Sequence, residues 1–305
     1  MRVAVTGATG AIGRALVGAL LARGDQVTVV TRDPDRARSS LPGTEPFAWL
    51  EPEHTPCPPG ALSERDAAVH LAGAPVAQRW TDRARRSIRD SRVLGTRNVV
   101  AGLAAAEPRP RILISQSASG WYGARRSERL DESAPAASGD FLAEVVVAWE
   151  KEAQAAEGLG LRVVMTRTGV VLSPSGGALE KMLPPFRLGL GGPVAGGDQY
   201  VPWVHLDDVV GAMLFCLDSS GARGPVNVTA PEPATNRELA HALGRTLRRP
   251  AVLPVPALAL RLLYGEMSTI VTTGARVVPA RLQALGYPFA QPDLERALQA
   301  AVHAA

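Results

Sequence analysis

The sequence predicts an α/β fold, a doubly wound parallel sheet with a smaller mixed or helical C-terminal domain. The first observation behind this prediction is an apolar strand at the amino end, followed at once by a glycine-rich turn and a helix. The second is the alternation of strands and helices through the first half of the chain, which implies right-handed βαβ units. At 305 residues the chain is long enough to bury a substantial core.

The glycine-rich turn reads Thr6-Gly7-Ala8-Thr9-Gly10-Ala11-Ile12-Gly13 and directly follows Val3-Ala4-Val5. Gly7 permits a tight turn, Gly10 lets the backbone approach a pyrophosphate closely, and Gly13 lets the helix pack against the strand. Free N–H groups and the helix dipole at this helix start favour a negatively charged group. The pattern predicts a Rossmann-type dinucleotide site, with contacts from Thr6, Gly7, Thr9, Gly10, Ala11, Ile12 and Gly13.

The residue after the second strand decides which dinucleotide is expected. Arg32 follows the predicted strand 26–31, where a site for NAD usually has an acidic residue that bonds the ribose hydroxyls. An arginine there suits a 2′-phosphate, with Arg36 and Arg38 as further candidates, so the sequence favours NADP(H) over NAD(H). Asp33 is one residue late for the ribose and is expected to cap the next helix. The alternative for Arg32 is a solvated loop charge.

The remaining elements follow from apolar runs, caps and turn residues. We expect strands at 67–71, 111–115, 161–167, 201–204 and 226–228. We expect helices at about 81–106, 141–157, 178–188 and 206–217, one opened by the capping box Thr235-Asn236-Arg237-Glu238, and a helical tail with a short hairpin. The predicted layout is an NADP-binding domain of residues 1–169 plus about 206–228, and a substrate or lid domain of about 170–205 plus 229–305, with substrate between them.

Ligands of parallel sheets bind at the carboxyl ends of the strands. This rule selects residues 71–73, at the end of one predicted strand, and the segments that follow Ser115 and Arg167. We therefore expect further cofactor contacts from Leu71, Ala72, Gly73 and Arg167.

Charge and composition exclude several classes of protein. The net charge is +4, and the basic residues are scattered among acidic ones without a long basic run. The densest group of arginines falls on a predicted helix: Arg83, Arg85, Arg86, Arg89 and Arg92. A solvated helix face explains this group, so we expect no nucleic-acid partner. The apolar stretch 257–263 is short and contains Arg261, so we expect no membrane span.

The cysteines indicate the cellular setting. Cys57 and Cys216 are far apart in the chain and lack neighbouring metal ligands, which predicts reduced thiols and no metal site. The first predicted strand begins at residue 2, which leaves no signal peptide before it. We expect a cytoplasmic monomer or homodimer whose partner is a small-molecule substrate.

Together these segments resemble the extended short-chain dehydrogenase/reductase superfamily. The resemblance is carried by the glycine-rich turn, His70-Leu71-Ala72-Gly73, residues 117–123 and Val204-His205-Leu206-Asp207-Asp208. The chain is similar in finer detail to the atypical "sugar nucleotide epimerase-like" branch with a C-terminal domain of unknown function. This likeness is carried by residues 80–81, 91–96, 141–143, 149–150, 167–172, 199–208, 227–231, 249–267 and 279–289. It implies the Rossmann-type fold, NADP(H) binding and a general reaction class, and the branch has no agreed substrate.

One departure from the superfamily pattern concerns proton transfer. In the superfamily a tyrosine exchanges a proton with substrate, and a lysine four residues later lowers its pKa and binds the ribose. None of the tyrosines of this chain has a lysine four residues on. In the corresponding helix, Phe141 or Leu142 takes the place of the tyrosine and Val145 or Val146 that of the lysine.

Other polar residues are candidates for the site. Ser117 matches the site-facing serine of the superfamily, with Ser119 as the other register, and a serine there can polarise a carbonyl; the alternative is a strand-end turn residue. Tyr122 is a second catalytic candidate, although the matching tyrosine mostly serves binding and packing. The expected catalytic residues are Ser117 and Tyr122, and the expected substrate contacts are Ser119, Gln199, Tyr200 and Trp203, with an aromatic core as the alternative for the last group. His70 is expected to be packed, and Asp208 to anchor the domains.

Three functions fit these observations. The first is an NADP(H)-dependent oxidoreductase, in which a serine, water or a substrate group supplies the proton. The second is a sugar-nucleotide epimerase, which the fold supports and the missing pair opposes. The third is a non-catalytic NADP(H)-responsive binding protein, in which cofactor binding outlived turnover.

Overall fold

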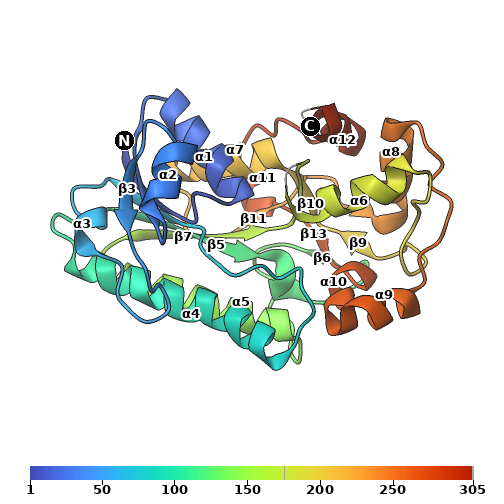
Figure 1. The fold of residues 1–305 in the computed structure, drawn as a ribbon, viewed down its shortest axis with the longest axis horizontal. Helices are drawn as coiled ribbons and strands as arrows, with labels where there is room; N and C mark the ends of the chain where they lie inside the picture. The colour runs from blue at the N-terminus through green and yellow to red at the C-terminus, as the bar shows by residue number, and fades with distance from the viewer. Residues whose placement is uncertain (175, 304–305) are drawn as a thin grey trace.

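The computed structural model describes residues 1–174 and 176–303. Its central sheet has seven parallel strands in the order β11-β7-β5-β4-β1-β2-β3. Figure 1 labels β3, β5, β7 and β11 of this sheet. The strands are β1 (Arg2–Thr6), β2 (Gln26–Thr31), β3 (Glu45–Ala48), β4 (Ala67–His70), β5 (Ile112–Ala118), β7 (Arg162–Thr168) and β11 (Gly224–Val228). The order reverses between β1 and β4, which confirms the doubly wound prediction and places the expected ligand crevice at the carboxyl ends of these strands.

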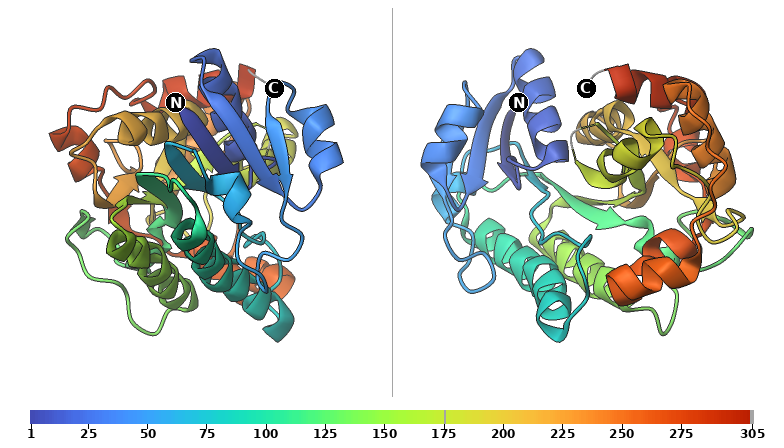
Figure 2. Two further views of the ribbon diagram at one scale, coloured as in Figure 1. Left: turned by 90° about the vertical axis from the view of Figure 1, so that its left-hand side faces the viewer. Right: turned by 45° about the vertical axis from the view of Figure 1, so that its right-hand side comes forward.

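Helices cover both faces of the sheet (Figures 1 and 2). One face carries α1 (Ala11–Ala22) and α7 (Leu206–Asp218), and the other carries α4 (Asp82–Ala105) and α5 (Phe141–Gln154). Alternate residues of a strand enter opposite cores: Val3 and Val5 join the core of the first pair, and Ala4 the core of the second. Because both faces are buried, the strands read as continuous apolar runs.

The other elements build the C-terminal part and the rim of the sheet. The helices are α2 (Pro34–Ser40), α3 (Pro59–Leu62), α6 (Gly177–Arg187), α8 (Asn236–Leu247), α9 (Ala257–Tyr264), α10 (Thr269–Thr272), α11 (Ala280–Ala284) and α12 (Leu294–His303). The 3-10 helices are η1 (Ser119–Tyr122), η2 (Ala155–Leu159) and η3 (Gly265–Ser268). Short strands pair in twos: β8 (Val170–Leu172) with β10 (Trp203–His205), β9 (Tyr200–Val201) with β12 (Ala234–Thr235), and β6 (Arg129–Leu130) with β13 (Arg276–Val277).

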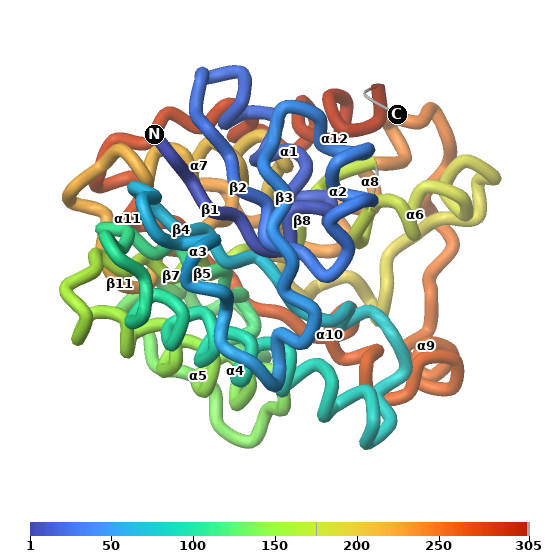
Figure 3. Tube along the Cα trace, turned by 60° about the vertical axis from the view of Figure 1, so that its left-hand side comes forward, coloured from blue at the N-terminus to red at the C-terminus, as the bar shows by residue number. Residues whose placement is uncertain are grey.

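The C-terminal part has its own apolar core, and polar contacts join it to the helices that flank the sheet. Residues of β8, α6, β10, α8 and α12 form this core. The carboxylate of Asp208 accepts hydrogen bonds from the Tyr287 hydroxyl at 3.1 Å and from the backbone N–H of Ala290 at 2.7 Å, which confirms its role as an anchor. At the other side, Arg85 near the start of α4 pairs with Glu266 of η3, the turn between α9 and α10, which are labelled in Figure 3.

The structure confirms the helix starts that the sequence predicted from capping residues. The side chains of Asp33, Thr81 and Thr235 cap α2, α4 and α8, the last with a complete capping box. The short hairpin expected in the tail is wrong, because β12 and β13 pair with the distant strands β9 and β6. Within the described residues, no helix is both long and apolar enough to cross a bilayer.

Candidate functional site

A cavity of about 600 Å³ lies at the carboxyl ends of β1, β4 and β5. Segments from the whole length of the chain contribute to its wall. They are the glycine-rich turn (Gly7, Gly10, Ala11, Ile12, Gly13), residues 71–77, Ser117 to Gly120, one face of α5 (Leu142, Val145, Val146, Trp149), Thr168 to Val171, Tyr200 to Pro202, and Thr269, Ile270 and Thr273. The cavity thus joins the predicted dinucleotide site to the predicted substrate site.

The glycine-rich turn has the geometry of an anion cradle. Gly7 has a positive φ of +69°, and a Cβ on it would lie 2.7 Å from the backbone N of Ala72. A Cβ on Gly13 would lie 2.3 Å from the carbonyl oxygen of Gly7. Gly10, the N-cap of α1, offers no side-chain acceptor to the first-turn N–H groups, and Ala11 and Ile12 line the cavity. These N–H groups fit a diphosphate, so the turn suits the dinucleotide that its sequence predicts.

The two threonines of the turn lie behind this cradle. Thr6 is buried, and its hydroxyl bonds His70 Nδ1 at 2.7 Å while it accepts the N–H of Leu71 at 3.2 Å, so it ties β1 to β4. The backbone carbonyl of Thr9 accepts the Nε–H of Arg14 at 2.9 Å. Neither threonine is among the residues that line the cavity.

Arg32 lies at the carboxyl end of β2 with an exposed side chain, outside the cavity lining. The charged residues after Arg32 interact with one another. The Asp33 carboxylate accepts the backbone N–H of Arg36 at 3.0 Å, and the Arg38 guanidinium pairs with Asp35 at 2.6 Å. Of the three arginines proposed for a 2′-phosphate, Arg38 therefore already pairs with a carboxylate. The assignment of Arg32 to the phosphate stays a prediction.

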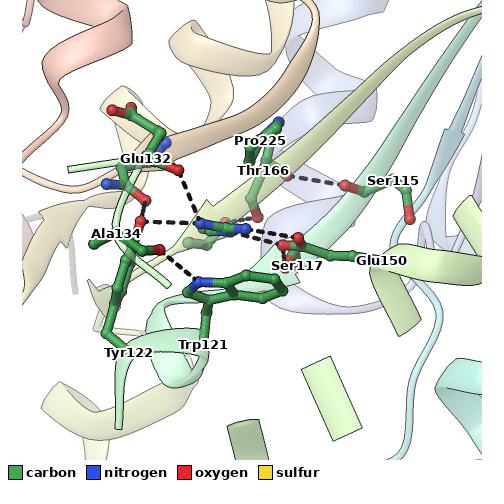
Figure 4. A network of polar contacts seen from close by, with 12 residues as sticks. Ser115, Ser117, Trp121, Tyr122, Glu132, Ala134, Glu150, Thr166 and Pro225 are labelled. Atoms are coloured by element: carbon green, nitrogen blue, oxygen red, sulfur yellow. Dashed lines mark hydrogen bonds and ion pairs between the residues drawn. The ribbon is translucent and has the colours of Figure 1, made fainter. Parts of the chain in front are cut away.

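A buried polar network stands behind the cavity wall at Ser117 (Figure 4). Arg167 donates from Nε and Nη2 to the two oxygens of Glu150, each at 2.8 Å. Ser117 is among the residues that line the cavity, and its hydroxyl donates to Glu150 Oε1 at 2.5 Å. Burial opposes the charge of Arg167, but hydrogen bonds and attraction from Glu150 outweigh it and raise the pKa of the guanidinium. Arg167 was predicted to contact cofactor, and the structure places it in this network instead of the cavity lining.

Tyr122 belongs to the same network. Its side chain is fully buried, its hydroxyl donates to Asn227 Oδ1 at 2.7 Å, and it accepts from Arg167 Nη1 at 3.2 Å. Burial raises the pKa of the phenol. The Trp121 ring lies 3.7 Å from Cζ of Arg167 (Figure 4). The two aromatic residues thus hold the guanidinium, and the Tyr122 hydroxyl is not among the groups that face the cavity.

The expected substrate contacts divide into two groups. Ser119 and Tyr200 line the cavity. The amide of Gln199 donates to the carbonyls of Val194 at 3.0 Å and Val271 at 2.8 Å. Trp203 is buried in the C-terminal core, where its indole N–H donates to the carbonyl of Glu232 at 3.1 Å. Trp203 is therefore a core residue, and Gln199 joins the loop at Val194 to the helix α10.

The apolar side chains that the sequence suggests in place of the proton-transfer pair lie at the start of α5. Leu142 and Val146, four residues apart on α5, both line the cavity. A Cβ on Gly120 would lie 3.5 Å from Cβ of Leu142 and 3.9 Å from Cγ2 of Val146. Phe141, the other register, packs edge-on against Trp80 with ring centroids 5.2 Å apart. Leu142 and Val146 therefore face the cavity from α5, and their replacement of the Tyr-Lys pair stays a prediction.

The interpretation of the helix arginines as a solvated face is wrong for Arg92. It lines the cavity, and Nη1 donates to the carbonyls of Ala74 at 3.0 Å and Ile88 at 3.1 Å. Burial lowers the pKa of its guanidinium to about 10. A sequence signal was present, because Arg92 is four residues after Ile88 and seven before Val99, on the apolar stripe of α4.

Comparison with known proteins agrees with this geometry. Residues 3–229 match the NAD dependent epimerase/dehydratase family, and residues 255–301 match DUF1731, a domain of unknown function. The chloroplastic SDR39U1 homolog of Arabidopsis thaliana, an epimerase family protein, is 39% identical over 306 residues that cover 98% of this chain and 86% of the relative. The crystal structure of human epimerase family protein SDR39U1 (isoform 2) with NADPH has a TM-score of 0.89 and 34% identity, covering 100% of both chains.

More distant structures share the fold alone. UDP-glucuronic acid 4-epimerase from Bacillus cereus, in complex with UDP-glucuronic acid and NAD, has a TM-score of 0.80 at 16% identity, covering 99% of this chain and 98% of its own. The closer matches span both the sheet and the C-terminal part, which confirms the resemblance that the motifs indicated. The chain belongs to the NAD dependent epimerase/dehydratase family, among the extended short-chain dehydrogenase/reductase proteins that carry a C-terminal DUF1731 domain.

Proposed function

We propose that this chain is an NADP(H)-dependent oxidoreductase of the extended short-chain dehydrogenase/reductase type that acts on a small molecule. One observation carries the proposal: a single cavity joins the glycine-rich anion cradle to Ser117, Ser119 and the apolar face of α5. The human relative crystallised with NADPH supports the choice of cofactor. When bound, NADP(H) supplies the hydride chemistry. The proposal assigns the cofactor to residues 1–169 plus about 206–228 and the substrate to the remainder.

Ser117 is the best-placed polar group for contact with the reacting oxygen of a substrate. Its hydroxyl proton is donated to Glu150, which leaves the oxygen lone pairs free to accept a hydrogen bond from the cavity side. Arg167 donates two hydrogen bonds to Glu150, which hold the carboxylate in place to accept the hydrogen bond of the serine hydroxyl. Tyr122 and Arg167 act through Ser117 and Glu150, as positioning residues.

Cofactor preference is tested by fluorescence titration with NADPH and NADH. We expect tighter binding of NADPH, because Arg32 is an exposed cation at the end of β2. Arg32→Ala should weaken NADPH binding by at least about tenfold and leave NADH binding unchanged, the scale of hydrogen bonds to a charged group. Arg38→Ala is the matched control, since its side chain pairs with Asp35. An unchanged preference in Arg32→Ala would show that the phosphate is held elsewhere.

Turnover is tested by following NADPH absorbance with a panel of carbonyl and enone compounds, and NADP⁺ reduction with the matching alcohols. Ser117→Ala should lower kcat by at least about tenfold, the lower range for one stabilising hydrogen bond in a transition state. Ser115→Ala is the control, because Ser115 is buried on the same strand outside the cavity lining. If no compound changes the absorbance although NADPH binds, the oxidoreductase proposal is wrong.

Leu142 and Val146 favour a second candidate, a non-catalytic NADP(H)-responsive binding protein. An apolar pair cannot exchange a proton, so the site could retain binding without turnover. This candidate predicts that NADPH changes the affinity for a protein partner, because a ligand shifts only equilibria in which it binds the two states differently. A sugar-nucleotide epimerase, the third candidate, would retain its cofactor through purification.

A further inference from the structure

We propose that the substrate of this cavity has an apolar body and one carboxylate, and that Arg92 binds the carboxylate. The inference rests on the proposed function and names the substrate class for the same site. It comes from three features of the cavity: the unpaired donors of Arg92, the apolar wall opposite the glycine-rich turn, and the separate anion cradle of that turn.

The guanidinium of Arg92 has hydrogen-bond donors to spare. Nη1 is used by the carbonyls of Ala74 and Ile88, at 3.0 and 3.1 Å. Within residues 1–174 and 176–303, neither Nε nor Nη2 of Arg92 donates a hydrogen bond, and no carboxylate forms an ion pair with it. These two groups form one edge of the planar fork, the arrangement that binds a carboxylate through two parallel bonds.

The position of this side chain is fixed before a ligand arrives. Cζ of Arg92 lies 5.3 Å from the centroid of the Trp149 ring, and a Cβ on Gly73 would lie 3.2 Å from the same atom. The Ser91 hydroxyl accepts the N–H of Ala74 at 3.0 Å, so α4 holds both polar groups of that residue. A preorganised guanidinium loses little conformational entropy when it binds an anion.

Charge favours an anion at this place. A half-buried cation without a counterion is costly, and a ligand carboxylate would remove that cost. Asp140, which also lines the cavity, is already engaged as the N-cap of α5, where it accepts the N–H of Ala143 at 2.9 Å. The glycine-rich turn supplies its own backbone donors for the cofactor diphosphate, which leaves Arg92 for the substrate.

The rest of the wall selects an apolar body. Leu142, Val145, Val146, Trp149 and Ile270 line the cavity. A sugar would leave hydroxyls unpaired against these side chains, and an unpaired buried hydroxyl costs free energy. An aromatic or branched aliphatic carboxylate meets both the apolar wall and the guanidinium.

Benzoate and benzamide test the inference, since they share a ring and differ in charge. Binding to protein saturated with NADP⁺ is measured by isothermal titration calorimetry, with inorganic phosphate as a third ligand. We expect benzoate to bind at least about tenfold more tightly than benzamide. Arg92→Gln should weaken benzoate by a similar factor and leave benzamide and NADP⁺ within about twofold. Arg92→Lys, which keeps the charge without the fork, should fall between wild type and Arg92→Gln. Arg89→Gln is the control, because Arg89 is exposed on the same helix.

Several outcomes would overturn the inference. Equal affinity for benzoate and benzamide would show that no charge is recognised, and unchanged benzoate binding in Arg92→Gln would place the anion elsewhere. Loss of NADP⁺ affinity in Arg92→Gln would assign the guanidinium to the cofactor. If phosphate binds more tightly than benzoate, the proposal that the substrate has an apolar body is wrong. A wild-type protein that does not bind NADP⁺ refutes the proposed function instead, and benzoate is then titrated into the protein alone.

Discussion

The ion pair between Arg167 and Glu150 should be a main determinant of stability. The two side chains are 3% and 8% exposed, and two hydrogen bonds of 2.8 Å join them. Arg167→Met leaves the Glu150 carboxylate buried, with the Ser117 hydroxyl still donating to it. Removal of one partner of a buried pair costs about 3–5 kcal/mol of unfolding free energy. We expect a loss in that range for Arg167→Met, measured by urea unfolding followed by tryptophan fluorescence.

The double variant separates the charge from the packing. Arg167→Met with Glu150→Met removes both charges, so it should lose less unfolding free energy than the sum of the single variants, with a coupling of about 1–3 kcal/mol. Arg97 and Glu152 form a matched pair that is also joined by two hydrogen bonds, at 3.1 and 2.7 Å, but Arg97 is 58% exposed. Arg97→Met should therefore leave the urea midpoint unchanged.

The same variants decide between two roles for Arg167. If it holds Glu150 and Ser117 in place, folded Arg167→Met should bind NADPH as tightly as wild type, because the guanidinium is outside the cavity lining. A variant of wild-type stability with weakened NADPH binding would refute this reasoning and return Arg167 to the cofactor contacts that the sequence predicted.

Two further variants test the strands and the turn around the cavity. Burial, helped by the nearby charge of Arg92, lowers the pKa of His70 from its usual 6.5 to about 4. The unfolded chain therefore binds a proton below pH 6.5 that the folded chain refuses, and His70 should cost about 2 kcal/mol of stability at pH 5 relative to neutral pH. His70→Asn should show a smaller loss of urea stability between pH 7.5 and pH 5, whereas His54→Asn, at an exposed site, should follow the wild type; equal pH slopes in all three proteins would contradict the assignment. Gly13→Ala should weaken NADPH binding at least about tenfold, because its Cβ would lie 2.3 Å from the Gly7 carbonyl and the turn must move. Gly18→Ala on the same helix meets nothing within 4 Å and should be neutral or stabilising, as expected from helix propensity; equal NADPH affinities of the two variants would show that the turn tolerates displacement.

The parts of the fold that the sequence predicted are those encoded by neighbouring residues. The glycine-rich turn, the strand before it and the caps at Thr81 and Thr235 are all local patterns, and the structure has each of them. Strand β3, Glu45–Ala48, escaped prediction because it has four residues, one of them Pro46. An edge strand tolerates proline because the backbone groups on one of its sides need no hydrogen-bond partner. The residues of β3 are therefore recognised as a strand only by their pairing with β2.

The site was harder to predict because its charges are matched across the fold. Glu150 has Lys151 beside it in the chain, but its partner is Arg167, on a strand that packs below α5. The position of a charged residue in the sequence therefore indicates the helix or strand that carries it, but not the residue with which it pairs. Arg92 shows the same limit, because a run of arginines reads as a solvated face until the stripe through Ile88 is considered.

Under the proposed function, the apolar side chains of Leu142 and Val146 leave proton exchange with the substrate to other groups of the cavity. Because these side chains hold no exchangeable proton, a proton that leaves or joins the substrate at the α5 side has no acceptor on them. Ser117 faces the same cavity and is already polarised toward Glu150 at 2.5 Å. Arg167 holds both oxygens of that carboxylate, so the serine hydroxyl donates to Glu150 while its oxygen can accept a further hydrogen bond. Under the proposed function, a substrate hydroxyl donates to this oxygen directly, whereas a substrate carbonyl requires the serine hydroxyl to turn away from Glu150.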